Sequence, residues 1–320
     1  MNLHIRRMKL PSTFWSCSLT VPLILACGGE PRTPGDSMAA ESSATGDTTV
    51  PEATRSGWES SLGPLLVIAG DQRQASAIFP NFSDSTLTDT TTFDTSILGG
   101  LRVDLFSRAG LVGHGELRAT PSRPRDDGCV AWPDASVTIV DSVGTHSGWT
   151  VALTSGRARA LVLDSVESLT GADSARLTVE VSRLASMVPD DTAAAFHGIP
   201  YFVRQVRRFR VSPDTHVLIA NVTRRINQEA NPREEQLFLV AERDGPSPGA
   251  RYSIAYHERV SGPEEAIESA DVLAAIALVP SGAPALVVIR DYGDGSAYAL
   301  ITRVPGNGWR LTWNSAYAGC

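Results

Sequence analysis

Five arginines in the third quarter of the chain have the type and spacing that anion binding requires. Three lie in a stretch, 201–211, that alternates as a β-strand does, and two end the next such stretch: Arg204, Arg208, Arg210, Arg224 and Arg225. Even spacing in a strand directs the first three to one face, and guanidinium groups bind carboxylates and phosphates through paired hydrogen bonds. The pattern predicts a binding face for an acidic ligand, a glycan or an envelope protein.

The alternative is a solvated sheet face whose arginines pair with glutamates on neighbouring strands. The candidate partners are Glu234, Glu235, Glu242 and Glu258. The sequence favours this paired sheet face, and the arginine face remains the strongest candidate for binding in the chain.

Few motifs indicate catalysis. The chain has no G-x-S-x-G, H-E-x-x-H, C-x-x-C or phosphate-loop sequence. The segment Phe93-Asp94-Thr95 resembles the Asp-Thr-Gly motif of aspartic proteases, but Ser96 stands in the place of the glycine and there is no second copy to share a proton. A periplasmic hydrolase that uses an acid pair is the alternative function, with Asp94, Asp190 and Asp191 as its candidate carboxylates. The motifs favour a protein that is not an enzyme.

Metal and cofactor sites are not predicted. The five histidines beyond the N-terminal region do not fall at metal-ligand spacing. The segment Asp291-Tyr-Gly-Asp294-Gly resembles the calcium loop of FG-GAP propeller blades, and the strands around it resemble a blade. That resemblance implies a propeller-like meander at the end of the chain. The loop lacks the alternating Asp-x-Asp-x-Asp ligands that calcium needs, which favours a hairpin turn.

The N-terminus resembles that of a bacterial lipoprotein. Arg6, Arg7 and Lys9 precede an apolar run that ends at Ala26-Cys27, as in a lipobox. The resemblance implies a signal peptide over 1–26, lipidation of Cys27, and an anchor in a membrane. Gly28 follows where aspartate would favour the inner membrane, so we expect an extracytoplasmic protein on the outer membrane, facing the periplasm or the surface. The Gly-, Pro- and Ser-rich segment 27–57 predicts a disordered tether.

Two cysteines, Cys129 and Cys320, remain after the signal peptide and Cys27 are set aside. Disulfides persist outside the cytoplasm, and a chain that ends in cysteine is best explained if that cysteine is tied down. The sequence therefore predicts a Cys129–Cys320 bridge.

Composition excludes some partners. Hydrophobic residues make up 42% of the chain, which is enough for a packed core, and the formal net charge is −7. A negative chain is a poor match for nucleic acid. Together with the lipoprotein resemblance, this predicts a lipid-anchored envelope protein with a binding or structural role, whose ligand the sequence does not identify.

The elements that would position these residues are mainly strands. Short apolar or alternating runs divide the chain into a β-rich half, 58–166, and a second half, 167–320, that adds a helix. The first half has runs at 64–69, 75–79, 101–106, 111–117, 137–140, 151–153 and 160–166. The second has them at 201–211, 217–226, 236–243, 252–260, 272–279, 285–292, 298–304 and 309–313.

Helical spacing of Leu177, Val181, Leu184 and Val188 predicts a helix over 172–188, followed by a short one over 192–197. The fold class is therefore mainly β. We expect antiparallel sheets arranged as a sandwich, a barrel or a propeller-like meander, with a helical insertion near 172–197 and with the second half packed against the first.

Overall fold

A computed structural model of the chain describes residues 58–59, 63–70, 74–80, 98–120, 128–143, 148–165, 168–189, 194–227, 231–245, 250–306 and 308–320. The chain divides into two units, Met1–Thr48 and Thr49–Cys320, and every described residue belongs to the second. The predicted signal peptide, Cys27 and the tether therefore lie outside the described residues. Within the described part, no helix is both long and apolar enough to span a membrane.

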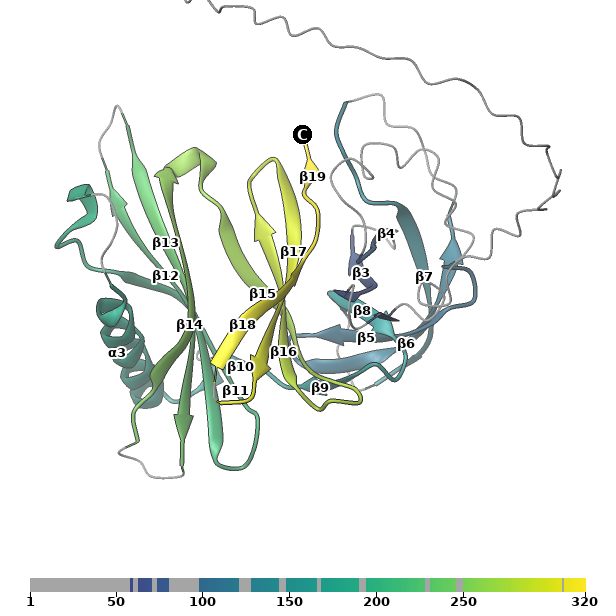
Figure 1. Ribbon diagram of the computed structural model, residues 1–320, viewed down its shortest axis with the longest axis horizontal. Helices are drawn as coiled ribbons and strands as arrows, with labels where there is room; N and C mark the ends of the chain where they lie inside the picture. Colours follow the sequence, from purple (N-terminus) through teal and green to yellow (C-terminus); the bar gives the residue numbers. More distant parts are fainter. Residues whose placement is uncertain are drawn as a thin grey trace, which may run out of the picture. The chain divides into compact units, whose positions relative to one another are not determined.

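The mainly β, antiparallel fold is confirmed, and it contains both a barrel and a pair of sheets (Figure 1). Six strands close the barrel in the order β3-β4-β7-β6-β5-β8. Their bounds are β3 (Leu66–Ala69), β4 (Gln74–Ile78), β5 (Arg102–Ser107), β6 (Gly110–Ala119), β7 (Asp134–Ser142) and β8 (Val151–Thr154). A small hairpin, β1 (Trp58–Glu59) and β2 (Gly63–Pro64), precedes it.

The second half folds into two sheets, not one continuous meander. The five-stranded sheet holds β10 (Asp164–Ser165), β11 (Phe202–Arg210), β12 (Thr215–Ile226), β13 (Arg233–Asp244) and β14 (Ser253–Pro263). The six-stranded sheet holds β9 (Ala158–Leu161), β15 (Ser269–Leu278), β16 (Pro284–Asp291), β17 (Gly295–Val304) and β18 (Gly308–Asn314), and β19 (Ala318–Gly319) pairs with β17. Two 3₁₀ turns, η5 (Ala194–Phe196) and η6 (Glu264–Ala266), complete the described elements.

The prediction of a single strand over 160–166 is wrong. The chain leaves β9 at Leu161 and enters β10 at Asp164, so the two pieces join different sheets. β9 pairs with β15, which places a strand of the predicted first half inside a sheet of the second. An apolar run without a turn signal reads as one strand, although the chain crosses between layers inside it.

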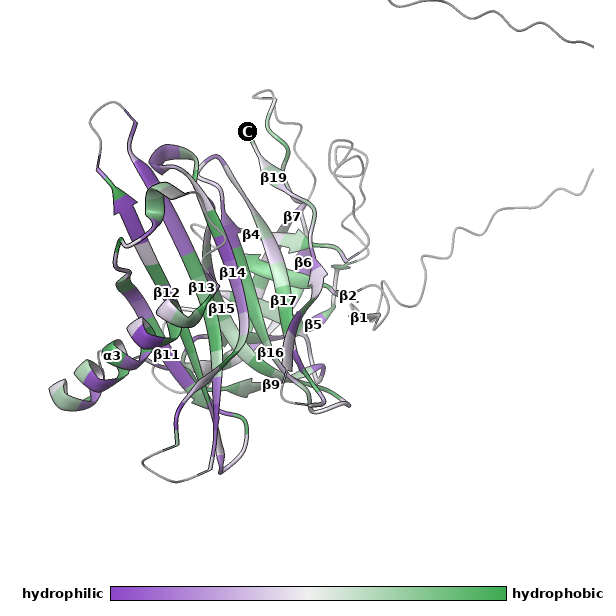
Figure 2. Cartoon of the chain, turned by 60° about the vertical axis from the view of Figure 1, so that its left-hand side comes forward, coloured by the Kyte–Doolittle hydropathy of each residue, from purple (hydrophilic) through white to green (hydrophobic). Residues whose placement is uncertain are grey.

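The layers follow one another from α3 (Gly171–Met187) through the five-stranded and six-stranded sheets to the barrel (Figure 1). Three apolar interfaces hold them together. Leu177, Val181 and Leu184 of α3 pack on the five-stranded sheet, the two sheets pack face to face, and the far face of the six-stranded sheet packs on the barrel. Figure 2 shows hydrophobic residues along the middle of these strands. Both faces of each sheet pack against another layer there, so the side chains that alternate between the two faces are hydrophobic on both.

The predicted helix is confirmed within one residue at each end. Thr170 caps it, because its Oγ1 accepts a hydrogen bond from the Asp173 amide at 3.3 Å. The second predicted helix reduces to the 3₁₀ turn Ala194–Phe196, and residues 190–193 lie outside the described residues.

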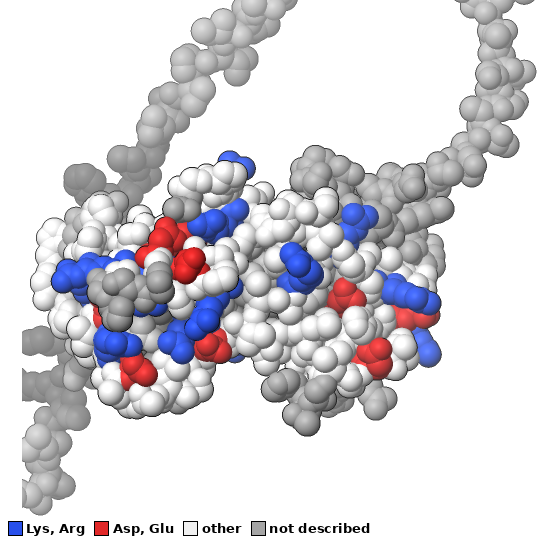
Figure 3. Space-filling model, turned by 90° about the horizontal axis from the view of Figure 1, so that it is seen from below, with Lys and Arg blue, Asp and Glu red and all other residues white. Residues whose placement is uncertain are grey.

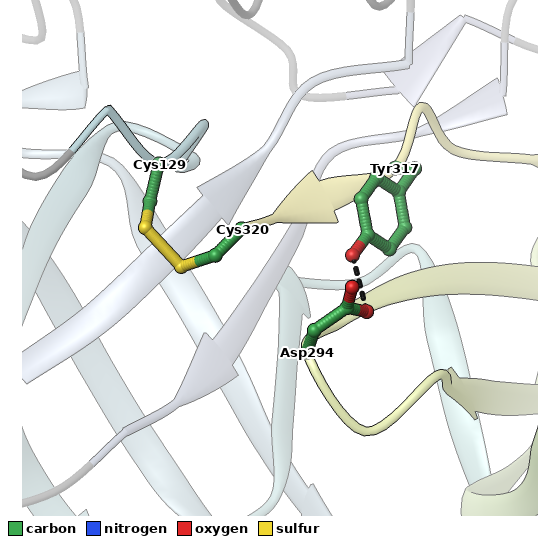
Figure 4. The surroundings of a disulfide bond; sticks show 4 residues. All are labelled: Cys129, Asp294, Tyr317 and Cys320. Carbon is green, nitrogen blue, oxygen red and sulfur yellow. Dashed lines mark hydrogen bonds between the residues drawn. A yellow bond between two sulfur atoms is a disulfide. The ribbon is translucent and has the colours of Figure 1, made fainter. Parts of the chain in front are cut away.

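The β16–β17 hairpin forms where the sequence predicts it, and its turn holds the C-terminus. Gly293 has φ = +85°, and the Tyr292 amide donates to the Gly295 carbonyl at 2.9 Å across the turn. The Asp294 carboxylate accepts the Tyr317 hydroxyl at 2.7 Å, and its carbonyl accepts the Cys320 amide at 3.0 Å (Figure 4).

The Cys129–Cys320 disulfide is confirmed, with a Cα–Cα distance of 4.4 Å across 191 residues of sequence (Figure 4). The Val130 amide donates to the Gly319 carbonyl at 2.9 Å beside it. The chain end is therefore tied to the segment that precedes β7.

Candidate functional site

A cleft of about 610 Å³ lies between the first half of α3, the ends of β11 and β13 in the five-stranded sheet, and the segment 250–252. We call it the arginine cleft, because four arginines line it: Arg176, Arg208, Arg243 and Arg251. Figure 3 views this end of the molecule from below, and arginine side chains gather on its left-hand half, which α3 and the five-stranded sheet form.

Packing of α3 brings the four arginines together. The apolar stripe of α3 covers the middle of the sheet, so the polar first turns of the helix overhang the strand ends that carry Arg208 and Arg243. Two hydrogen bonds hold the segment 250–252, the third wall of the cleft, against α3. The Tyr252 amide donates to Glu180 Oε1 at 3.2 Å, and Arg183 Nη2 donates to the Tyr252 carbonyl at 2.8 Å.

The one carboxylate in the lining, Glu180, is already neutralised. Arg183 donates to both of its oxygens, at 2.6 and 2.9 Å, and this hydrogen bonding lowers the pKa of Glu180 in spite of its partial burial. Glu180 therefore shapes the wall and does not cancel the charge of the lining arginines.

The arginines themselves are weakly paired. Arg176 contacts Asp173 at 2.8 Å on an exposed surface, and Arg208 lies 3.6 Å from Asp164. Such exposed pairs contribute little. The Arg243 guanidinium stacks 5.2 Å from the Tyr252 ring centroid, and its buried Nε has no hydrogen-bond partner among the described residues. No hydrogen bond or ion pair joins Arg251 to another described residue.

His216 lies in the positive electrostatic potential of the arginines around it. It lies opposite Arg243 in one strand pair and opposite Arg210 in the other. Burial lowers the pKa of His216, and the charges of Arg243, Arg210 and Arg208 lower it further, while Asp214 opposes them weakly. The local field therefore disfavours a cation, as an anion-binding site requires.

The predicted arginine face does not exist as one surface, so that part of the prediction is wrong. Arg208 lines the arginine cleft and Arg210 is exposed at the strand end beside it. Arg204 sits at a bulge between Val203 and Gln205, and it lines a different cleft together with Arg225. A bulge adds a residue and reverses the alternation beyond it, which a count of even spacings cannot detect.

Arg224 and Arg225 pair with glutamates on the neighbouring strand, as the alternative interpretation predicted. Arg224 is buried against Glu235, and Arg225 forms an ion pair with Glu234. Adjacent strand residues point to opposite faces, so these two arginines do not belong to one site.

Sequence reasoning missed three of the four arginines of the cleft as binding residues. Arg176 lies on the side of α3 away from its apolar stripe, and nothing in the local pattern distinguishes it, Arg243 or Arg251 from surface arginines. Only the approach of α3 to the strand ends identifies them.

One acid–histidine pair could serve acid–base chemistry. Asp104 Oδ1 lies 2.8 Å from His114 Nδ1, and the same buried carboxylate accepts the Ser155 hydroxyl and the Gly156 amide, each at 2.8 Å. Among the described residues no hydroxyl is hydrogen-bonded to His114 Nε2, so the arrangement fixes the β8–β9 turn and completes no triad. Asp94, Asp190 and Asp191 lie outside the described residues.

The described residues contain no group of three or more His, Cys, Asp and Glu side chains that could hold a metal ion. No known protein family, curated protein or solved structure matches this chain. Its function must therefore be inferred from its own side chains.

Proposed function

We propose that this chain is a binding protein of the cell envelope, anchored through lipid on Cys27, and that it captures a ligand with an acidic group in the arginine cleft. The charge of the cleft indicates the class of ligand. Four arginines line the cleft, and its one glutamate, Glu180, is already paired with Arg183. The lipobox-like sequence before Cys27 supports the membrane anchor, an extracytoplasmic location and the outer membrane as the site.

The chemistry of the lining favours a carboxylate or a phosphate on a partly apolar ligand. Guanidinium groups bind both anions through forked hydrogen bonds. Between the arginines, the lining contains Ala175, Leu177, Val179 and Ala250. A small hydrophilic anion would leave those aliphatic side chains uncovered, so a ligand with an apolar portion beside its acidic group fits better.

His216 provides a direct test, because an anion bound near Arg208 and Arg243 would offset the positive field that lowers its pKa. Protein with isotope-labelled histidine is titrated with acid in the presence of hexaglutamate, which supplies carboxylates, or of pyrophosphate, which supplies phosphates. We expect the pKa of His216 to rise with the anion that binds.

Variants distinguish the cleft from general surface charge. We expect the double variant R208Q/R243Q to weaken binding of the same anion at least tenfold, the equivalent of about 1.4 kcal/mol. The matched control R310Q removes an exposed arginine of β18, outside the cleft, and should bind like the parent. Equal losses in both variants, or no rise in the pKa of His216 with either anion, would refute the proposal.

A further inference from the structure

Tyr252 adds an uncharged donor to the arginine cleft. It lies directly before β14 and lines the cleft, with its ring beside the Arg243 guanidinium. The hydroxyl has no hydrogen-bond partner among the described residues. The residue is 6% exposed, and its oxygen is not one of the fully enclosed polar atoms. A ligand in the cleft can therefore reach this hydroxyl.

The charges that act on the Tyr252 hydroxyl all line the same cleft. Burial raises the pKa of this hydroxyl, and Arg243 and Arg208 lower it. Glu180 and Arg176 act on the pKa more weakly, in opposite directions. Because burial outweighs the arginines, the hydroxyl keeps its proton at neutral pH and remains a donor. It is placed to donate to an anion that the arginines hold.

The cleft has a surplus of about two positive charges. Arg243 and Arg251 have no carboxylate partner in the part of the chain that the structure describes. The other two lining arginines, Arg176 and Arg208, each lie beside one exposed acid. A carboxylate on the ligand would bring one negative charge, whereas a phosphate monoester carries about 1.5–2 negative charges at neutral pH. The phosphate monoester matches the surplus more closely.

The donors come from three walls of the cleft. Arg176 lies on α3, Arg208 and Arg243 lie at the ends of β11 and β13, and Arg251 and Tyr252 lie in the segment 250–252. A carboxylate has two oxygens in one plane, which a single guanidinium fork can satisfy. A phosphate has three terminal oxygens that point in three directions, so it can accept hydrogen bonds from all three walls at once.

We propose that the ligand of the arginine cleft is a phosphate monoester with an aliphatic portion, and that the Tyr252 hydroxyl donates to a phosphate oxygen beside Arg208 and Arg243. The aliphatic portion covers Val179, a lining residue of α3 that is 70% exposed. This assignment rests on the proposed function, because it names the class of ligand for the same cleft.

Three ligands with the same hexyl chain test the acidic group. The full chain is titrated by calorimetry, slightly above neutral pH, with hexyl phosphate, hexanesulfonate and heptanoate. Hexanesulfonate has three terminal oxygens but a single charge, and heptanoate has two oxygens and a single charge. We expect hexyl phosphate to bind at least tenfold more tightly than either, because it alone approaches two charges.

Tyr252→Phe removes the hydroxyl and keeps the ring beside Arg243. We expect Y252F to weaken binding of hexyl phosphate about tenfold. The thermal midpoint of the unliganded variant should stay equal or rise, since no internal hydrogen bond is lost. The matched control Tyr317→Phe removes a hydroxyl outside the cleft, where it donates to Asp294, and should bind hexyl phosphate like the parent.

A phosphate monoester can belong to a soluble metabolite or to a lipid headgroup. Dihexanoyl phosphatidate carries the group as a lipid does, and its short chains keep it in solution. Tighter binding of dihexanoyl phosphatidate than of hexyl phosphate would identify a lipid as the source, and the reverse order would identify a soluble metabolite. Either order supports the phosphate assignment.

Three outcomes would overturn this assignment and leave the cleft as a general anion site: equal affinity for hexyl phosphate and heptanoate, equal or tighter binding of hexanesulfonate, and unchanged affinity in Y252F. Absence of binding by all the ligands would overturn it too. The pKa of His216, measured with hexaglutamate and pyrophosphate, then decides separately whether the cleft binds anions at all.

Discussion

Arg224 Nε donates to Glu235 Oε1 at 2.8 Å in an ion pair whose side chains are 4% and 0% exposed. The Tyr201 hydroxyl donates to the same carboxylate oxygen at 2.5 Å, and the guanidinium of Arg224 lies 4.7 Å from the Tyr201 ring centroid and 5.5 Å from that of Phe196. The cluster joins the segment between α3 and β11 to the middle strands of the five-stranded sheet.

Glu235→Gln should destabilise the protein strongly, because it removes the charge of a buried carboxylate that accepts from both Arg224 Nε and the Tyr201 hydroxyl. Removal of one partner of a buried pair costs about 3–5 kcal/mol. The midpoint of urea unfolding, followed by circular dichroism, measures the change in the free energy of unfolding.

The matched control is Asp164→Asn, which makes the same chemical change in the exposed pair with Arg208. We expect it to alter the free energy of unfolding by less than about 1 kcal/mol. If E235Q and D164N unfold at the same urea concentration, the buried pair does not stabilise the fold.

Removal of the disulfide through the double variant C129S/C320S should lower the free energy of unfolding by about 2–5 kcal/mol, because the bridge closes a long loop in the unfolded chain. The same urea unfolding experiment measures it. Parent protein treated with reductant is the control, and its midpoint of urea unfolding should equal that of the double variant.

Gly319→Ala tests how the chain end is docked. A Cβ at this position would lie 2.5 Å from the Cα of Gly295 and 2.6 Å from the Asp294 carbonyl oxygen. Both are backbone atoms that cannot rotate away, so G319A should increase proteolysis at the C-terminus. Unchanged proteolysis would mean that β19 does not approach β17 this closely.

Stability should depend on pH through His216. Its pKa is lowered in the folded state by burial and by Arg243, Arg210 and Arg208, so the unfolded chain binds the proton at higher pH than the folded chain. The stabilisation is therefore fully present above the unfolded pKa of about 6.5 and is lost as pH falls through the folded value.

His216→Gln should reduce the loss of stability between neutral and mildly acidic pH, as measured by thermal unfolding at a series of pH values. The same profile in H216Q as in the parent would contradict the assignment.

Lipidation is expected on Cys27, since an apolar run and a small residue precede it. In a bacterial host, the parent should incorporate a palmitate analogue and partition into detergent, and C27A should do neither. Cys17, in the same N-terminal region, offers a matched control, and C17A should label like the parent. Equal labelling of C27A and the parent would exclude this anchor.

Local chemistry determined much of this fold from the sequence. The alternation of Tyr298, Leu300 and Thr302 and the glycines around Asp294 define a hairpin, because side-chain direction and positive φ depend on neighbouring residues. The spacing of Leu177, Val181 and Leu184 defines α3 for the same reason. The Cys129–Cys320 bridge followed from the count of cysteines and from the extracytoplasmic location that the lipoprotein resemblance implies.

Only the tertiary structure decided which strands share a sheet and which arginines share a cleft. An alternating strand pairs equally well with many partners, so no local pattern separates β11–β14 from β15–β18 or places β9 beside β15. The bulge at Arg204 changes which face its side chain occupies, and it shows only in the pairing with β12. Arg176 on α3 and Arg243 on β13 are far apart in the chain, yet they line the same cleft. Their positions depend on how the layers pack, and packing is a property of the whole core.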